Sequence, residues 1–268
     1  IGDAFALPLL NALKEHYYDT SNIKIVVSTA AVLSASVKQE LLAKLPDTVM
    51  MIESIGATEG GIQAMSQVMG SDANTGPLAY TMREGSVLLN SERTAILPPP
   101  SAEHQTADEV GWLAHTGNLP LGYLGDPEKT AATFIEIDGT RYSVGGDRAY
   151  YGADGAMYFL GRESMCINTG GEKVYVEEVE RIVKSHPDIY DTLVVGVPSE
   201  RWGQEVTAVV TLAAGATCPS VEALRTHCDP HLARYKLPRR IVVAEAIQRL
   251  PNSKPDYAWA KEYAGIRD

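Results

Sequence analysis

The chain has 268 residues, 45% of them apolar, which is enough to bury the core of one large domain or two ordinary ones. Its formal net charge of -11 argues against nucleic acid or an anionic membrane surface as a general partner, because both attract surfaces rich in Lys and Arg. Three cysteines provide no disulfide framework, and neither a signal peptide nor a membrane-spanning apolar run is evident, which favours a cytoplasmic location.

The first fifty residues alternate between helical and strand patterns. Asp3 can cap a first helix, and residues 23–27 are typical of a buried strand. Ser36 and Gln39 form a capping box for a second helix, which residues 49–52 follow as another buried strand. A strand, a helix and a strand in this order predict a parallel pair joined by a crossover.

Shorter elements follow. Residues 66–76 are expected to form a loop, and residues 86–114 are typical of a small β subdomain. Asp126 caps a short helix with proline at its first position, Asp138-Gly139 is a two-residue hairpin signal, and a second hairpin is expected to turn at Asp154-Gly155.

The last hundred residues form a compact α+β module. The pattern predicts helices and strands at residues 176–186, 192–197, 206–212, 221–231, 240–243 and 256–264. The sequence therefore predicts an α/β domain with a small β subdomain at residues 1–162 and an α+β domain at residues 163–268, with a hinge near residues 162–165.

The segment SIGATEGG, residues 54–61, follows a predicted strand, where open α/β sheets bind ligands. The carboxylate of Glu59, beside the Thr58 hydroxyl, suits Mg²⁺, which proteins hold with one or two carboxylates together with substrate phosphates. The simpler alternative makes Thr58 a helix N-cap with Glu59 in the first helical turn.

Three further positions could carry chemistry. Asp147 follows two glycines and could accept hydrogen bonds from a ribose, or it could be a plain turn residue. Arg162 could reach a phosphate. Residues 169–173 offer exposed backbone amides beside one Lys, and they could form an anion-binding cradle before the following helix or a glycine-rich turn with a solvated Lys. Lys254 lies between prolines in a loop and could place a compact charge in a cleft, although most loop lysines are merely solvated.

Two thiols and two imidazoles also lie close together in the sequence. Their spacing lacks the paired Cys-x-x-Cys of structural zinc sites, and adjacent helical residues diverge in direction, so zinc binding is disfavoured. These residues are Cys218, His227, Cys228 and His231.

The order of these motifs resembles the adenylate-forming superfamily of acyl-CoA synthetases, luciferases and peptide-synthetase adenylation domains. SIGATEGG resembles its Tyr-Gly-x-Thr-Glu element, VGGDRAYYGADGAMYFLGR its ribose-binding and hinge segment, NTGGEKVYVEEVE its thioester-forming loop, and LPNSKPDYAW its C-terminal lysine loop. The segment PLGYLGDPEKT is most similar in texture to bacterial fatty-acid and steroid-side-chain CoA ligases.

The resemblance implies ATP, Mg²⁺, coenzyme A and a hydrophobic carboxylic acid as ligands, and it implies a role for each motif. Lys254, Glu59 and Thr58 would be catalytic, with Mg²⁺ on Glu59 and Ser164 as the hinge residue. The nucleotide would contact Ser54, Ile55, Gly56, Ala57, Thr58, Asp147 and Arg162. Coenzyme A would contact Asn168, Gly170, Gly171, Glu172, Lys173 and Arg201.

The sequence departs from the family pattern at several positions. Ile55 replaces the usual aromatic residue, Thr29-Ala30 replaces glycines, Val176 replaces a common Pro, and Ser164 stands where Asp or Lys is frequent. No Ser/Thr/Gly-rich phosphate loop followed by Lys is present, so the resemblance covers the C-terminal half of such an enzyme. The missing N-terminal half, or a second copy in a homo-oligomer, is then a candidate partner.

The resulting hypothesis is an acyl-CoA synthetase that forms an acyl adenylate and transfers it to coenzyme A, with the 268-residue piece alone inactive or weakly active. One alternative is a non-catalytic remnant that binds coenzyme A or a nucleotide. Another is a luciferase-like or amino-acid-adenylating relative.

Overall fold

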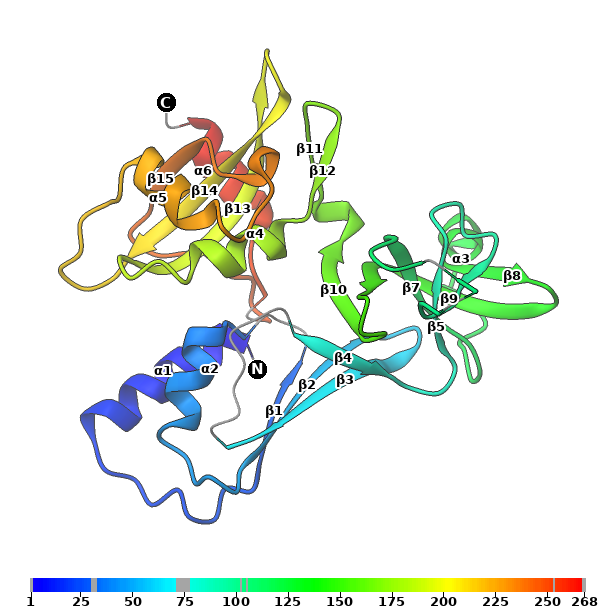
Figure 1. Cartoon of the computed structure of the whole chain (residues 1–268), viewed down its shortest axis with the longest axis horizontal. Helices are drawn as coiled ribbons and strands as arrows, with labels where there is room; N and C mark the ends of the chain where they lie inside the picture. Colours follow the sequence, from blue (N-terminus) through cyan, green and yellow to red (C-terminus); the bar gives the residue numbers. More distant parts are fainter. Residues whose placement is uncertain are drawn as a thin grey trace. The chain divides into compact units, whose positions relative to one another are not determined.

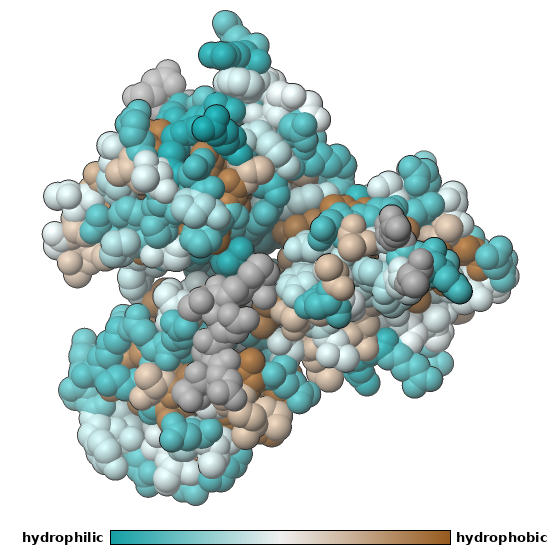
Figure 2. Space-filling view, in the orientation of Figure 1, coloured by the Kyte–Doolittle hydropathy of each residue, from teal (hydrophilic) through white to brown (hydrophobic). Residues whose placement is uncertain are grey.

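A computed structural model describes residues 2–29, 33–70, 78–101, 103–104, 106–252 and 254–266. The chain divides into two compact units, which comprise Ile1–Arg162 and Glu163–Asp268. Hydrophilic residues are spread over the whole face drawn in Figure 2. None of the helices in the described ranges has the length and apolar character needed to cross a bilayer.

The first unit begins with the predicted α/β crossover. The elements are α1 (Gly2–Glu15), β1 (Ile25–Thr29), α2 (Ala35–Leu42) and β2 (Met50–Ala57). Strands β1 and β2 are parallel, and the two helices lie side by side next to them (Figure 1). Leu10, Leu41 and Met51 are fully buried between the helices and the sheet, which explains the helical spacing of the apolar residues.

Both predicted caps in this region are wrong. Asp3 lies inside α1, and its Oδ1 accepts a hydrogen bond from the backbone N–H of Ser34 at 2.7 Å. Ser34, rather than Ser36, is the N-cap of α2, and its side chain makes no capping hydrogen bond. The carboxylate of Asp3 thus orders the start of the neighbouring helix, a tertiary contact that local sequence patterns do not reveal.

Strand β2 continues past the predicted end into an antiparallel hairpin with β3 (Gly61–Met69). Met50 lies opposite Met69, so the expected loop from Ser66 is wrong as far as Met69, and residues 71–77 lie outside the described residues. The polar side chains that indicated a loop belong to a strand that is only half buried, where polar residues are tolerated on the outer side.

The β subdomain extends the same sheet. Within the described residues, ten strands pair in the order β1-β2-β3-β4-β10-β9-β7-β5-β6, with β8 on β9. The predicted turn at Asp138-Gly139 is confirmed, because both residues have positive φ, 48° and 74°, as a type I′ turn requires. The added elements are β4 (Ala79–Met82), β5 (Ser86–Leu89), β6 (Ile96–Leu97), β7 (Gly111–His115), α3 (Pro127–Thr133), β8 (Phe134–Ile137), β9 (Thr140–Tyr151) and β10 (Met157–Arg162).

Two other local predictions for this subdomain are confirmed. Asp126 is the N-cap of α3, and its Oδ1 accepts from the backbone N–H of Lys129 at 2.9 Å. Strands β9 and β10 form the second hairpin, whose connection contains Asp154-Gly155.

The second unit is an α+β domain, as the sequence predicts. Its helices and strands form three layers. Helices α4 and α5 pack on one face of the β13–β14 pair, and α6 packs on the other. Strand β13 is therefore buried on both faces, which explains its unbroken apolar run. The elements are η1 (Glu163–Met165), β11 (Ile167–Thr169), β12 (Glu172–Val174), α4 (Val176–Val183), β13 (Ile189–Ser199), β14 (Gly203–Leu212), α5 (Val221–Cys228), η2 (Arg234–Lys236), β15 (Arg240–Val243) and α6 (Tyr257–Ile266).

Candidate active site

Thr58 and Glu59 lie in the tight turn that joins β2 to β3, so the helix N-cap alternative is wrong. Ser54, Ile55, Gly56 and Ala57 are the last residues of β2, directly before this turn. The turn packs closely on the β subdomain, because a Cβ placed on Gly60 would lie 3.0 Å from Ser143 Oγ. The glycine therefore lets the turn approach β9 and fixes where Glu59 projects.

The carboxylate of Glu59 accepts a hydrogen bond from the hydroxyl of Tyr123. This hydrogen bond lowers the pKa of Glu59, and Lys129 and Arg162 act in the same direction. The ammonium of Lys129 lies 3.9 Å from the centre of the Tyr123 ring, a cation–π contact that holds the ring in place. The sequence analysis missed Tyr123, although it lies in the segment PLGYLGDPEKT.

Asp147 lies within β9, and its side chain is almost fully buried, so the plain turn alternative is wrong. It pairs across the hairpin with Arg162 of β10, whose Nε lies 3.1 Å from Asp147 Oδ1. Burial raises the pKa of Asp147, and the guanidinium of Arg162 offsets only part of that effect. The side chain of Arg162 is half exposed, so its outer edge can still meet a ligand.

The end of β2 and the middle of β9 lie next to each other. A Cβ on Gly145 would lie 3.4 Å from Ala57 Cβ and 4.0 Å from Asp147 Oδ2. The structure thus brings the Glu59 turn, Asp147 and Arg162 into one region of the first unit. This region carries two carboxylates and one guanidinium beside backbone without bulky side chains.

The turn also borders a cavity of about 610 Å³. Gly60, Gly61, Arg83 and His115 contribute to its lining. The His115 imidazole accepts from or donates to Ser86 Oγ at 3.0 Å, and burial, followed by the charge of Arg83, lowers its pKa. Glu59 itself does not line this cavity, which lies on the side of Gly60 and Gly61.

Glu59 fits a role as a magnesium ligand in one respect: the hydrogen bond from Tyr123 lowers its pKa and so favours the ionised carboxylate that binds a cation. No group of three or more His, Cys, Asp or Glu side chains suited to a metal occurs in the part of the chain that the structure describes. A Mg²⁺ ion here would therefore need oxygens from phosphates and water, which is the usual arrangement for this ion.

In the second unit, Asn168, Gly170, Gly171, Glu172 and Lys173 form the β11–β12 hairpin. Both glycines have positive φ, 61° and 87°, as the two-residue turn requires. The segment lies before α4, as the sequence indicates, with the short strand β12 between the turn and the helix. Lys173 is ion-paired with Glu163 of the short helix that also contains Ser164.

Trp202 lies against this hairpin and was missed by the sequence analysis. Its backbone carbonyl accepts from the N–H of Gly170 at 2.8 Å, and a Cβ on Gly170 would lie 3.2 Å from its ring. The guanidinium carbons of Arg201 and Arg239 lie 4.6 and 4.0 Å from the centre of the ring. Two cations therefore stack on one aromatic ring beside the glycine turn, in a protein that is acidic overall.

Lys254 is exposed on a loop whose neck is closed by hydrogen bonds. The backbone N–H of Leu250 donates to the carbonyl of Lys254 at 2.8 Å, and that of Asp256 donates to Gln248 at 3.2 Å. Arg249, at the base of the loop, contacts Asp191 near the start of β13, whereas the glycine hairpin pairs with Gly203, opposite the end of β13. From Asp191 to Ser199 the strand spans about 26 Å.

The Cys and His residues considered for zinc lie in different surroundings. Cys228 is buried in the core, and burial raises the pKa of its thiol to about 11. Cys218 is exposed. His227 packs edge-on against His186, with 5.0 Å between ring centres, and its Nε2 lies 2.8 Å from Ser185 Oγ.

Comparison with solved structures defines the fold. The amide bond synthetase McbA of Marinactinospora thermotolerans matches with a TM-score of 0.77 and 22% identity over 98% of this chain and 52% of that one. ATP-bound MatB from Rhodopseudomonas palustris matches with a TM-score of 0.73 and 23% identity, over 98% of this chain and 54% of that one. The chain therefore has the fold of part of an adenylate-forming enzyme.

Sequence relatives identify the family more closely. The medium-chain acyl-CoA ligase Mig of Mycobacterium avium is 45% identical over 98% of this chain, and the 3-oxocholest-4-en-26-oate–CoA ligase of Rhodococcus rhodochrous is 41% identical over 99%. The chain spans 46% and 47% of the lengths of these two proteins, about half. Residues 178–254 match the AMP-binding enzyme C-terminal domain. The chain is thus homologous to part of these acyl-CoA ligases and contains that C-terminal domain, which confirms the resemblance in its motifs.

Proposed function

We propose that the whole protein is an acyl-CoA ligase, which activates a hydrophobic carboxylic acid with ATP and transfers the acyl group to coenzyme A. The observation that carries this proposal is the similarity of almost the entire chain to acyl-CoA ligases at 41–45% identity. The chain corresponds to the C-terminal half of such an enzyme, and the acid it activates belongs to the medium- or long-chain fatty acids or the steroid side-chain acids.

The nucleotide is held by the first unit. Asp147 accepts from the ribose hydroxyls, Arg162 contacts the ribose or a phosphate, and the end of β2 lies along the adenine. The pairing of Asp147 with Arg162 at 3.1 Å supports this assignment, because it fixes both side chains before a ligand arrives. Bound Mg²⁺ would be held by Glu59 and would neutralise phosphate charge. Tyr123 supports that role by keeping Glu59 ionised and oriented.

Lys254 serves the first half-reaction. A carboxylate is a poor acyl donor. Its oxygen attacks the α-phosphorus of ATP, the bond to the β-phosphate breaks and pyrophosphate leaves, and the product is an acyl adenylate whose AMP is a good leaving group. The Lys254 ammonium bridges the carboxylate and the α-phosphate, where a compact charge stabilises the developing negative charge. Its exposed position at the closed neck of its loop supports this role.

The glycine hairpin serves the second half-reaction, in which the thiol of coenzyme A displaces AMP. The Trp202 ring lies against Gly170, whereas the space that a Cβ on Gly171 would take is open, and this open side suits the approach of the pantetheine arm. The stack of Arg201, Trp202 and Arg239 supplies cations and an aromatic face for the nucleotide end of coenzyme A.

The proposal is tested by assaying each half-reaction in the complete protein with a panel of fatty and steroid acids. We expect acid-dependent exchange of pyrophosphate into ATP, loss of exchange by a factor of at least about 100 in Lys254→Ala, and little or no exchange by the 268-residue chain alone. Exchange by this chain at the rate of the complete protein, or full activity of Lys254→Ala, would contradict the proposal. Calorimetry with ATP and with coenzyme A separates an enzyme from a remnant, since a remnant would bind coenzyme A without supporting exchange.

A further inference from the structure

We propose that Arg249 and Tyr257 are positioning residues that clamp the two ends of the Lys254 loop onto two buried carboxyl groups, those of Asp191 and Glu180. The inference rests on the proposed function, in which Lys254 acts in acyl-adenylate formation. The clamp determines where the ammonium of Lys254 lies when the loop meets its substrate.

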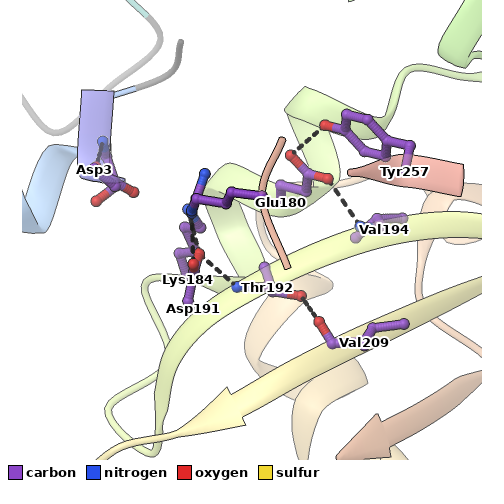
Figure 3. A network of polar contacts seen from close by, with 10 residues as sticks. Asp3, Glu180, Lys184, Asp191, Thr192, Val194, Val209 and Tyr257 are labelled. Carbon is purple, nitrogen blue, oxygen red and sulfur yellow. Dashed lines mark hydrogen bonds and ion pairs between the residues drawn. The ribbon is translucent and has the colours of Figure 1, made fainter. Parts of the chain in front are cut away.

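The first end of the loop is held through Asp191. Its Oδ2 lies 2.6 Å from Nη2 of Arg249, the residue before the loop, and its Oδ1 lies 2.8 Å from Nζ of Lys184, the C-cap of α4. The backbone N–H of Thr192 donates to the same Oδ1 at 2.9 Å (Figure 3). One nearly buried carboxylate of β13 therefore ties the loop to the end of a helix and to this strand at once.

The second end is held through Glu180 of α4. Its Oε2 accepts from the hydroxyl of Tyr257 at 3.1 Å, and its Oε1 accepts from the backbone N–H of Val194 at 2.8 Å (Figure 3). Tyr257 is the first residue of α6 and lies three positions after Lys254. Glu180 is 6% exposed, so water does not replace either bond.

These contacts are costly as a device for stability alone. Burial of a polar carboxyl group carries a desolvation penalty, and apolar side chains of similar volume often give equal or greater stability at such places. Two buried carboxyl groups, ionised in Asp191 and protonated in Glu180 at neutral pH, nevertheless each bond to β13 and to one end of the loop. Such bonds are directional, whereas apolar packing is not, so they fix an orientation as well as a depth.

The consequence is a short loop whose two ends are fixed. Its neck is already closed by the hydrogen bonds of Leu250 and Asp256. Holding both ends on β13 reduces the conformational entropy that the loop must lose when Lys254 meets the reacting groups.

Tyr257→Phe tests the clamp, because it removes one hydroxyl and keeps the ring. Tyr263→Phe is the matched control: it removes a hydroxyl from the same helix, one that donates to the carbonyl of Val243 at 3.1 Å, away from the loop. In the complete protein we expect Tyr257→Phe to lower kcat for acyl-adenylate formation about tenfold, with the KM for ATP and thioester formation from supplied acyl adenylate unchanged. The control should retain both half-reactions. Equal effects of the two substitutions would overturn the clamp.

A second measurement is independent of catalysis. In the 268-residue chain, hydrogen exchange at the amides of Leu250 and Asp256 should be about tenfold faster in Tyr257→Phe and unchanged in Tyr263→Phe. Glu180→Gln should keep the slow exchange, because an amide can accept from Val194 and donate to the oxygen of Tyr257. Unchanged exchange in Tyr257→Phe would refute the clamp even if Lys254 is essential. Accelerated exchange with no effect of Lys254→Ala on catalysis would support the clamp and refute the role proposed for Lys254.

Discussion

Substitution of Glu180 by Gln should change how the stability of the second unit depends on pH. Glu180 is buried in the core, and burial raises the pKa of its carboxyl group from the ordinary 4.5 to about 8. The nearby charge of Glu177 acts in the same direction, whereas the N–H of Val194, the charge of Lys184 and the hydroxyl of Tyr257 oppose it.

The sign follows from proton uptake. Between pH 4.5 and about 8 the unfolded chain has an ionised Glu180, whereas the folded chain keeps the proton. Folding therefore binds a proton, and the stabilising contribution is complete below pH 4.5 and is lost as the pH rises through about 8. Each pH unit in this window removes at most about 1.4 kcal/mol, so the total over about 3.5 units is on the order of 5 kcal/mol.

Gln cannot ionise but has nearly the same shape. In urea denaturation of the 268-residue chain between about pH 5.5 and pH 8, the free energy of unfolding of Glu180→Gln should gain about 3 kcal/mol relative to the unsubstituted chain. Trp202 and Trp259 report unfolding of the second unit by fluorescence, and other titrating groups cancel in the difference. A difference that stays constant over the whole range would refute the assignment of a protonated, buried Glu180.

Two further substitutions test the candidate site. Gly170→Ala should destabilise the second unit by about 2 kcal/mol or more, and Gly171→Ala by about 1 kcal/mol. Both positions need positive φ, but only a Cβ on Gly170 meets the Trp202 ring, at 3.2 Å. Equal losses of stability in denaturation experiments would argue against this close contact. Tyr123→Phe should raise the pKa of Glu59, because the hydrogen bond that favours the carboxylate is lost; an NMR titration in which that pKa stays in place or falls would exclude the hydrogen bond.

The sequence predicted those parts of the fold that depend on local patterns. The cap at Asp126, the turn at Asp138-Gly139 and the succession of elements after Val176 are confirmed, because each follows from neighbouring residues alone. The resemblance in four ordered motifs likewise led to the right family. It did so despite departures such as Ile55, which lies half buried in β2.

The failures arise where distant residues decide the structure. The length of β2 depends on pairing with β3, and the start of α2 depends on Asp3, 31 positions before Ser34. Tyr123 lies in PLGYLGDPEKT, the segment that resembles bacterial CoA ligases, and this resemblance could have identified it as a site residue. Trp202 gave no local signal, because its role comes from its contact with Gly170, 32 positions away in the sequence.

The register of β13 gives a physical reason to expect the second unit to turn between the two proposed half-reactions. The Lys254 loop is attached to β13 at Asp191 and, through Glu180, at Val194, and the glycine hairpin pairs with Gly203, opposite Ser199, so the strand separates the attachments by about 17 to 26 Å. A rigid strand of that length cannot present both loops to one reacting centre, so one enzyme that uses both must turn this unit between the steps. We place the pivot at Ser164, in the short helix tied to the hairpin through Glu163 and Lys173. In the complete protein, Ser164→Pro should retain acyl-adenylate formation and lower thioester formation at least about tenfold, because proline restricts rotation about its own backbone. Equal loss of both half-reactions in Ser164→Pro would remove Ser164 as the pivot.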